Sequence, residues 1–113
     1  MCKKSDLAQI NKIIMKAYQD AYGSNLVKVY LYGSYARGDY TQDSDIDFVA
    51  LVNEERKAVQ KQLDDIWSVS CGLGLDYDVL ISPTAIPYEE FMKMKDILPY
   101  YDNLYKEGVE ISA

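Results

Sequence analysis

The spacing of apolar residues along the chain of 113 residues predicts a regular succession of helices and strands. In the N-terminal segment, apolar residues recur at steps of three and four positions, which is the spacing of one helix face: Leu7, Ile10, Ile14, Ala17, Tyr18 and Ala21. Two β-branched and aromatic runs follow, "LVKVYLY" at 26–32 and "IDFVALV" at 46–52. These runs predict two strands, with a turn-rich connector between them.

The second half of the chain predicts a long helix over 54–71, which places Val59, Leu63, Ile66 and Ser70 on one side. The glycines of "GLG" are predicted to end this helix. The run "YDVLI" at 77–81 predicts a third strand, and the prolines that follow it indicate a loop. Residues 88–106 are predicted to be helical, with an interruption near Pro99.

The connections between these elements predict the topology of the sheet. The helical crossover between the second and third strands favours a parallel pair, whereas the short connector between the first two allows an antiparallel pair. We therefore expect an α/β (α+β) fold, in which a small mixed β-sheet carries flanking helices. The chain length fits a single domain over residues 1–113.

Composition and charge exclude several classes of protein. A net charge of -6 is unfavourable for broad nucleic-acid binding, so no direct nucleic-acid contact is expected. No apolar run approaches the ~18 residues of a membrane span, and the N-terminal segment is too polar for a signal peptide. Cys2 and Cys71 lack metal-type spacing, which is consistent with reduced thiols in a cytoplasmic protein. Because histidine is absent, proton transfer would use a carboxylate, tyrosine, lysine or water.

An acidic cluster supplies the candidate chemistry. Asp45 and Asp47 stand at the start of the second strand, where alternation places both side chains on one face, about 7 Å apart along the strand. Asp78 lies near the start of the third predicted strand, so parallel pairing in register would bring it beside them. Three carboxylates in this arrangement would form a magnesium site of the kind that holds nucleotide phosphates. Asp76 is the alternative third acid, but Asp78 is preferred because apolar strand residues flank it.

A glycine turn precedes the acidic cluster and is suited to phosphate binding. Gly33 has no Cβ, so backbone N–H groups can approach a phosphate closely, and the Ser34 hydroxyl adds a donor. Arg37 could neutralise phosphate charge, or it could pair with Asp39 or Asp43. Both of these aspartates are otherwise expected to be solvated turn residues.

Two further residues near this region have open roles. Ser44 could cap the turn or donate a hydrogen bond to a phosphate. Trp67 lies next to the apolar stripe of the second long helix, and core or interface packing is a better interpretation for it than base stacking.

The segment "GSYARGDYTQDSDIDFVAL" at 33–51 resembles the signature of the DNA polymerase beta-like nucleotidyltransferase superfamily. Its form, Gly-Ser-x-Ala-Arg-Gly followed by Ser-Asp-x-Asp, is similar to the smallest branch, the minimal nucleotidyltransferases. The segment "PYYDNLYKEGVEI" at 99–111 resembles the C-terminus of that branch. The resemblance therefore extends over nearly the whole chain and implies the polymerase beta-like fold.

The resemblance also implies a division of roles. Gly33 and Ser34 would bind the triphosphate of ATP or another nucleoside triphosphate, and Asp45 and Asp47 would hold two magnesium ions. Asp78 would complete one metal site and help to activate the acceptor hydroxyl. The reaction would be a displacement at the α-phosphate with pyrophosphate as the leaving group.

The length leaves little chain for holding an acceptor. Minimal nucleotidyltransferases of this type are commonly encoded beside a HEPN-domain ribonuclease, and the resemblance implies an antitoxin that transfers AMP to a tyrosine of that toxin. Two alternatives stay open: a binding module that blocks its partner without catalysis, and an aminoglycoside-type nucleotidyltransferase completed by dimerisation. The sequence gives neither the nucleobase preference nor the oligomeric state.

Overall fold

The computed structural model describes residues 4–41 and 44–111. The elements of the first half are α1 (Lys4–Tyr22), a 3-10 turn η1 (Gly23–Asn25), β1 (Leu26–Tyr32), α2 (Ser34–Arg37) and β2 (Ile46–Val52). Those of the second half are α3 (Arg56–Tyr77), β3 (Ile81–Pro87), α4 (Tyr88–Met94), α5 (Pro99–Glu107) and β4 (Val109–Ile111). Within these ranges, no helix has the length and apolar character needed to cross a bilayer.

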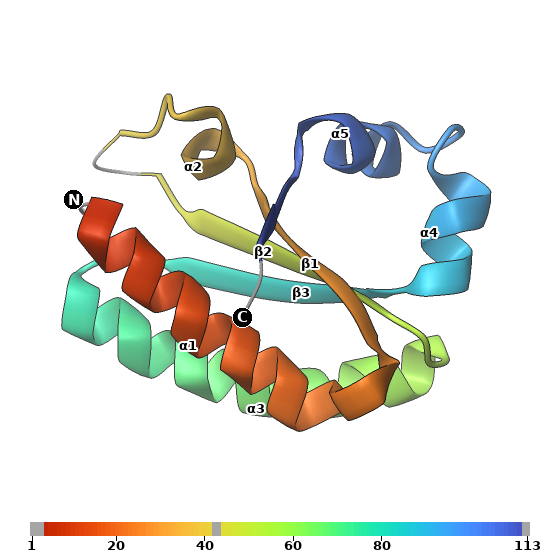
Figure 1. Cartoon of the computed structure of the whole chain (residues 1–113), viewed down its shortest axis with the longest axis horizontal. Helices are drawn as coiled ribbons and strands as arrows, with labels where there is room; N and C mark the ends of the chain where they lie inside the picture. Colours follow the sequence, from red (N-terminus) through yellow and green to blue (C-terminus); the bar gives the residue numbers. More distant parts are fainter. Residues whose placement is uncertain (1–3, 42–43, 112–113) are drawn as a thin grey trace.

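The sheet has four strands in the order β3-β2-β1-β4 (Figure 1). Strands β2 and β3 are parallel, and β1 is antiparallel to both β2 and β4. The expected mixed sheet with flanking helices is confirmed, as are the parallel pair and the antiparallel pair. The short strand β4 was not predicted.

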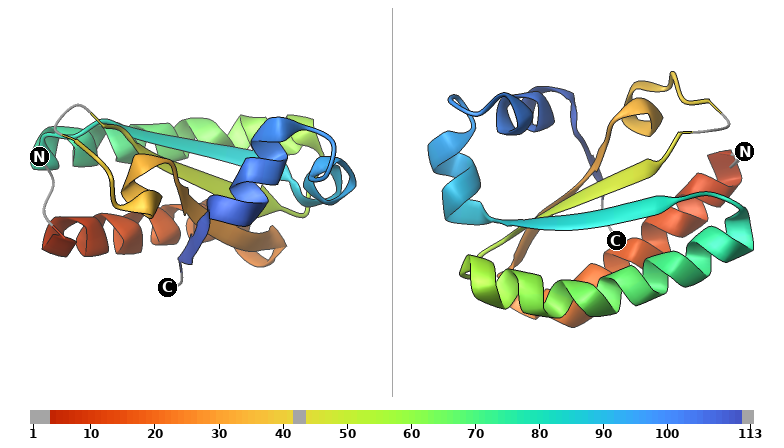
Figure 2. Two further views of the ribbon diagram at one scale, coloured as in Figure 1. Left: turned by 90° about the horizontal axis from the view of Figure 1, so that it is seen from above. Right: turned by 180° about the vertical axis from the view of Figure 1, so that it is seen from behind.

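Helices cover both faces of the sheet. The long helices α1 and α3 lie side by side against one face, and α4 and α5 lie against the other (Figures 1 and 2). Side chains of β2 point alternately to the two faces of the sheet. Ile46 and Phe48 pack in the core with α1 and α3, whereas Val49 and Leu51 pack in the core with α4 and α5. Burying each of these apolar side chains stabilises the folded state by about 1.5–3 kcal/mol relative to leaving it exposed. Asp47 lies between two residues of the first set, so its side chain points to the α4 and α5 face.

The helix α3 continues past the glycines that were predicted to end it. Leu73 is buried and adds a further residue to the apolar stripe. The helix ends at Tyr77. A Cβ at Gly74 would lie 2.6 Å from the carbonyl oxygen of Val79, and the Val79 N–H donates to the Gly74 carbonyl at 3.1 Å. Gly74 therefore allows the returning chain to pack closely on the helix. The turn is completed by Asp78 in the left-handed conformation, with φ 53 and ψ 52.

The third strand lies later in the chain than predicted. β3 spans Ile81–Pro87, so that residues 82–87, which we interpreted as a loop because of Pro83 and Pro87, belong to the strand. Only Ile81 belongs both to the predicted and to the observed strand. Ile81, Pro83 and Ala85 are buried in alternation, as in a half-buried strand. Proline has no backbone N–H group to donate to a neighbouring strand. The prolines are tolerated because β3 is an edge strand, and its outer side pairs with no other strand among the described residues. The predicted interruption near Pro99 is confirmed as the break between α4 and α5.

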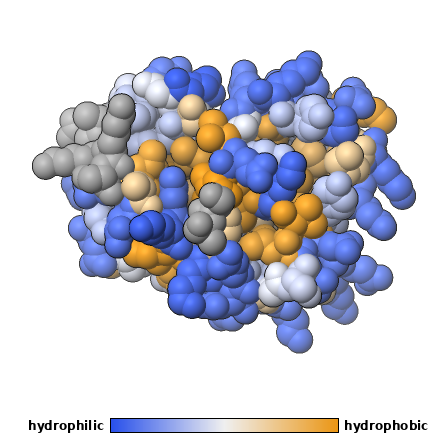
Figure 3. All heavy atoms as spheres, viewed as in Figure 1, coloured by the Kyte–Doolittle hydropathy of each residue, from blue (hydrophilic) through white to orange (hydrophobic). Residues whose placement is uncertain are grey.

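The surface in the orientation of Figure 1 has an apolar centre. Figure 3 shows hydrophobic residues gathered in the middle of this face, around β1 and β4, with hydrophilic residues over α1 and along the rim. Val27 of β1 and Val109 of β4 are both exposed.

Candidate functional site

The two aspartates of the acidic cluster lie at the N-terminal end of β2, as predicted. Asp45 is exposed and directly precedes the strand, and Asp47 is half-buried within it. In the sheet, Asp47 is paired with Tyr32 of β1 and with Ser82 of β3. Cross-strand partners share a face of the sheet, so all three side chains face the α4 and α5 side.

The Asp47 carboxylate is in an environment that disfavours its negative charge. Burial raises the pKa of Asp47 above its usual value, and the nearby charge of Asp45 raises it further. In the part of the chain that the structure describes, neither carboxylate forms an ion pair with a lysine or arginine. A cation placed between the two would therefore stabilise both.

Gly33 brings the backbone of the preceding turn against this carboxylate. Its dihedral angles, φ 81 and ψ -153, belong to a region that only glycine adopts readily. A Cβ at this position would lie 2.9 Å from Asp47 Oδ2. The Gly33 carbonyl accepts the N–H groups of Ala36 and Arg37, both at 3.1 Å, which starts α2 at Ser34. Gly33 thus lies against Asp47, as predicted, and Ser34 follows it as the first residue of α2.

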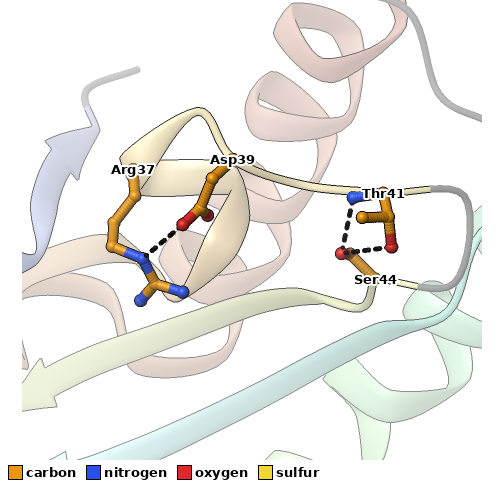
Figure 4. A network of polar contacts seen from close by, with 4 residues as sticks. All are labelled: Arg37, Asp39, Thr41 and Ser44. Carbon is orange, nitrogen blue, oxygen red and sulfur yellow. Dashed lines mark hydrogen bonds and ion pairs between the residues drawn. The ribbon is translucent and has the colours of Figure 1, made fainter.

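Arg37 and Ser44 make local contacts on the turn between α2 and β2 (Figure 4). Arg37 Nε donates to Asp39 Oδ2 at 3.3 Å, and both side chains are exposed. The N–H of Thr41 donates to Ser44 Oγ at 2.8 Å, so Ser44 caps the turn. Asp43 lies outside the described residues. Because exposed ion pairs are weak, Arg37 can exchange Asp39 for a phosphate at little cost.

Asp78 is not beside Asp47, which corrects the predicted geometry. The β3 residue paired with Asp47 is Ser82, because α3 is longer and β3 begins later than expected. Asp78 instead lies in the connection after α3, where it lines a cavity together with Asp45. Asp76 is exposed in the last turn of α3. Among the described residues, no three acidic, cysteine or histidine side chains are grouped closely enough to hold a metal ion.

Sequence reasoning missed an aromatic pair next to Asp47. Tyr32 and Tyr100 meet edge to face, with ring centroids 5.8 Å apart and an interplanar angle of 85°. Burial raises the pKa of Tyr100, and the charge of Asp47 adds to this shift. Tyr100 comes from α5, at the far end of the chain, so no local pattern could place it here. The aromatic pair thus lies next to the Asp47 carboxylate.

Comparisons with known proteins identify similar sequences. A family model described as a nucleotidyltransferase domain matches residues 9–107. "Putative protein adenylyltransferase MJ0141" of Methanocaldococcus jannaschii is 35% identical over 106 residues, which cover 94% of this chain and 99% of that protein.

Two solved structures share the fold. One is described as a "putative minimal nucleotidyltransferase" (TM-score 0.58, 19% identity), and the match covers 95% of this chain and 94% of that one. The other is a toxin–antitoxin structure with AMP-PNP (TM-score 0.55, 20% identity), and the match covers 88% of this chain and 70% of that one.

Proposed function

Because the chain belongs to the nucleotidyltransferase domain family, we propose that it transfers AMP from ATP to a tyrosine hydroxyl of a partner protein. The observation that carries this proposal is the contact between the Gly33 turn and Asp47, with Asp45 two residues away. A glycine turn suited to phosphate thereby adjoins two carboxylates suited to a cation.

The donor set fits magnesium. Mg2+ is commonly bound by one or two carboxylates, with the remaining positions filled by water and substrate phosphates. Asp45 and Asp47 supply such a pair, and their mutual repulsion would be relieved by the ion. We propose two ions in the nucleotide complex, with phosphate oxygens as further ligands. Bound magnesium would neutralise charge on the triphosphate and on the departing pyrophosphate.

The residues of the chain have distinct roles in the proposed reaction. The Gly33 and Ser34 backbone and the Ser34 hydroxyl bind the triphosphate, and Arg37 adds a positive charge after it leaves Asp39. The acceptor oxygen attacks the α-phosphorus, a phosphodiester bond forms, and the bond to pyrophosphate breaks. Asp78, in the cavity that it shares with Asp45, supports deprotonation of the acceptor hydroxyl.

A protein acceptor is supported by the similarity to the "putative protein adenylyltransferase" of Methanocaldococcus jannaschii. The toxin–antitoxin structure with AMP-PNP supports ATP as the nucleotide and a toxin as the partner. We propose a HEPN-domain toxin in the cytoplasm as the acceptor, so that the chain acts as an antitoxin by modifying it.

The test is transfer of label from α-labelled ATP, with magnesium, to the protein encoded by the neighbouring gene. Asp45→Asn/Asp47→Asn should abolish transfer. The matched control is Asp64→Asn/Asp65→Asn, which changes two exposed aspartates on α3 and should transfer normally. A tight complex without transfer, unaffected by the first double variant, would instead indicate neutralisation by occlusion. Labelling of an aminoglycoside by a dimer would indicate the small-molecule reaction.

A further inference from the structure

The cavity that Asp45 and Asp78 share extends along the outer side of α3 as an apolar groove, and none of these roles explains its apolar part. The groove has a volume of about 520 Å3 and is lined by residues from the C-terminal half of α3 and from the start of β3. Figure 2 (right) shows these two elements on the near side of the molecule. Its lining includes Trp67, Cys71, Leu75 and Leu80, with Asp45 and Asp78 at one end. We propose that this α3 groove docks an apolar segment of the acceptor protein that also carries lysine or arginine. That this segment belongs to an acceptor rests on the proposed function, whereas the apolar and acidic character of the groove does not depend on it.

The apolar lining faces solvent without a partner. Trp67, Cys71 and Leu75 follow one another at steps of four residues and so form one stripe of the helix. The exposed fractions are 39% for Trp67, 85% for Leu75 and 60% for Leu80. The other side of α3 already supplies the core. An amphipathic helix normally places polar residues on its outer side, so a second apolar stripe is typical of an interaction surface.

The charges of the groove determine which partner it suits. Asp45 and Asp78 are acidic, and none of the described residues that line the groove is a lysine or arginine. A second copy of this chain, with its net charge of -6, would bring the same carboxylates together across a two-fold interface. A segment with positive charge beside its apolar residues complements both features.

The length of the apolar stripe favours a polypeptide over a nucleobase. Trp67 and Leu75 are eight residues apart, which is about 12 Å along a helix. An amphipathic helix or an extended segment can contact this whole length, whereas one base covers only part of it. Because Asp45 belongs both to the groove and to the carboxylate pair, a docked segment would lie next to the site of transfer. Docking there would hold an acceptor hydroxyl within reach of the nucleotide.

Trp67 provides a direct readout, since it is the single tryptophan of the chain. The probe is a synthetic helical peptide of leucine and lysine, titrated into the full chain without nucleotide and compared with a leucine and glutamate peptide. The lysine peptide should shift Trp67 emission in a saturable way, and the glutamate peptide should not. Leu75→Arg should weaken binding at least about tenfold, as for a central interface residue. Ile97→Arg, at a position that is 68% exposed outside the groove, should bind like the wild type.

The proposal is overturned if the lysine peptide leaves Trp67 emission unchanged, or if the glutamate peptide binds equally well. ATP alone producing the shift would assign the groove to the nucleobase, and a dimer abolished by Leu75→Arg would assign it to a second copy. Transfer to the acceptor with unchanged KM in Leu75→Arg would reject docking but retain the transferase. Peptide binding without any transfer activity would retain docking and reject the proposed function.

Discussion

Gly33 and Asp47 lie so close together that a Cβ at Gly33 would come within 2.9 Å of the Asp47 carboxylate oxygen. Gly33 directly follows β1 and Asp47 is the second residue of β2, so the antiparallel pairing of Tyr32 with Asp47 brings the two together. The same contact links the turn that is proposed to bind phosphate with the carboxylates that are proposed to bind metal.

Gly33→Ala should therefore impair both stability and transfer. The backbone conformation at φ 81 and ψ -153 costs a residue with a Cβ about 1–3 kcal/mol, and the new methyl group would displace the Asp47 carboxylate. Thermal unfolding and label transfer measure the two effects. Gly38→Ala is the matched control, because Gly38 has φ 85 but nothing within 4 Å of an added Cβ. It should lose stability while folded protein keeps its transfer activity. Normal transfer by folded Gly33→Ala would contradict the account.

Without metal, the ionised Asp47 side chain should destabilise the fold. Its pKa is raised from 3.8 in the folded protein, so the folded state binds a proton more tightly than the unfolded state. Stability from this group is therefore lost as the pH rises from 3.8 through the raised pKa. The free energy of unfolding of Asp47→Asn, relative to wild type, should increase over this interval and then level off. Urea unfolding at stepped pH measures the difference, and a flat difference would exclude the effect.

Glu90 should show the opposite dependence on pH. The hydrogen bond from Tyr101, at 2.7 Å to Glu90 Oε2, and the pairing with Arg56 lower the pKa of Glu90 from 4.5. This stability is present above pH 4.5 and is lost as the pH falls through the lowered pKa. Tyr101→Phe should cost about 1 kcal/mol at neutral pH and less in acid, as urea unfolding would show. Tyr105→Phe, whose ring is exposed, is the control, and equal losses would disprove a specific role for the Tyr101 hydroxyl.

The ring of Tyr100 should matter more for activity than its hydroxyl. Edge-to-face contact with Tyr32 holds the ring beside Asp47, and such pairs contribute about 0.5–1.5 kcal/mol. Tyr100→Ala removes the ring from beside Asp47 and should raise KM for ATP or for the acceptor roughly tenfold. Tyr100→Phe keeps the ring and should stay within a few-fold of wild type. Steady-state kinetics of both variants decide the matter, and equal KM values for the two would exclude a role for the ring.

The elements that were predicted well are those whose signals are local. Residues 26–32 and 46–52 form β1 and β2 with the predicted bounds, because β-branched and aromatic residues fill both runs. Asp45 and Asp47 were placed correctly for the same reason. Their proposed chemistry depends on these two strands and on the Gly33 turn between them.

The errors come from contacts between distant parts of the chain. Gly74 looks like a helix breaker, but its role is to admit the Val79 carbonyl after the chain has turned back. Pro83 and Pro87 suggest a loop unless the edge position of β3 is known. Because of these features, the third strand begins later in the chain than predicted, and Asp78 lies before the strand instead of within it. The position of Tyr100 depends on how α5 packs over the sheet.

The central claim is that Asp45 and Asp47 hold a complex of magnesium and nucleotide against the Gly33 turn. Calorimetric titration of ATP into the protein, with and without magnesium, tests this claim without any acceptor. The account predicts tight binding only with magnesium, and loss of that binding in Asp45→Asn/Asp47→Asn but not in Asp64→Asn/Asp65→Asn. Equal ATP binding without magnesium, or in the first double variant, would contradict it.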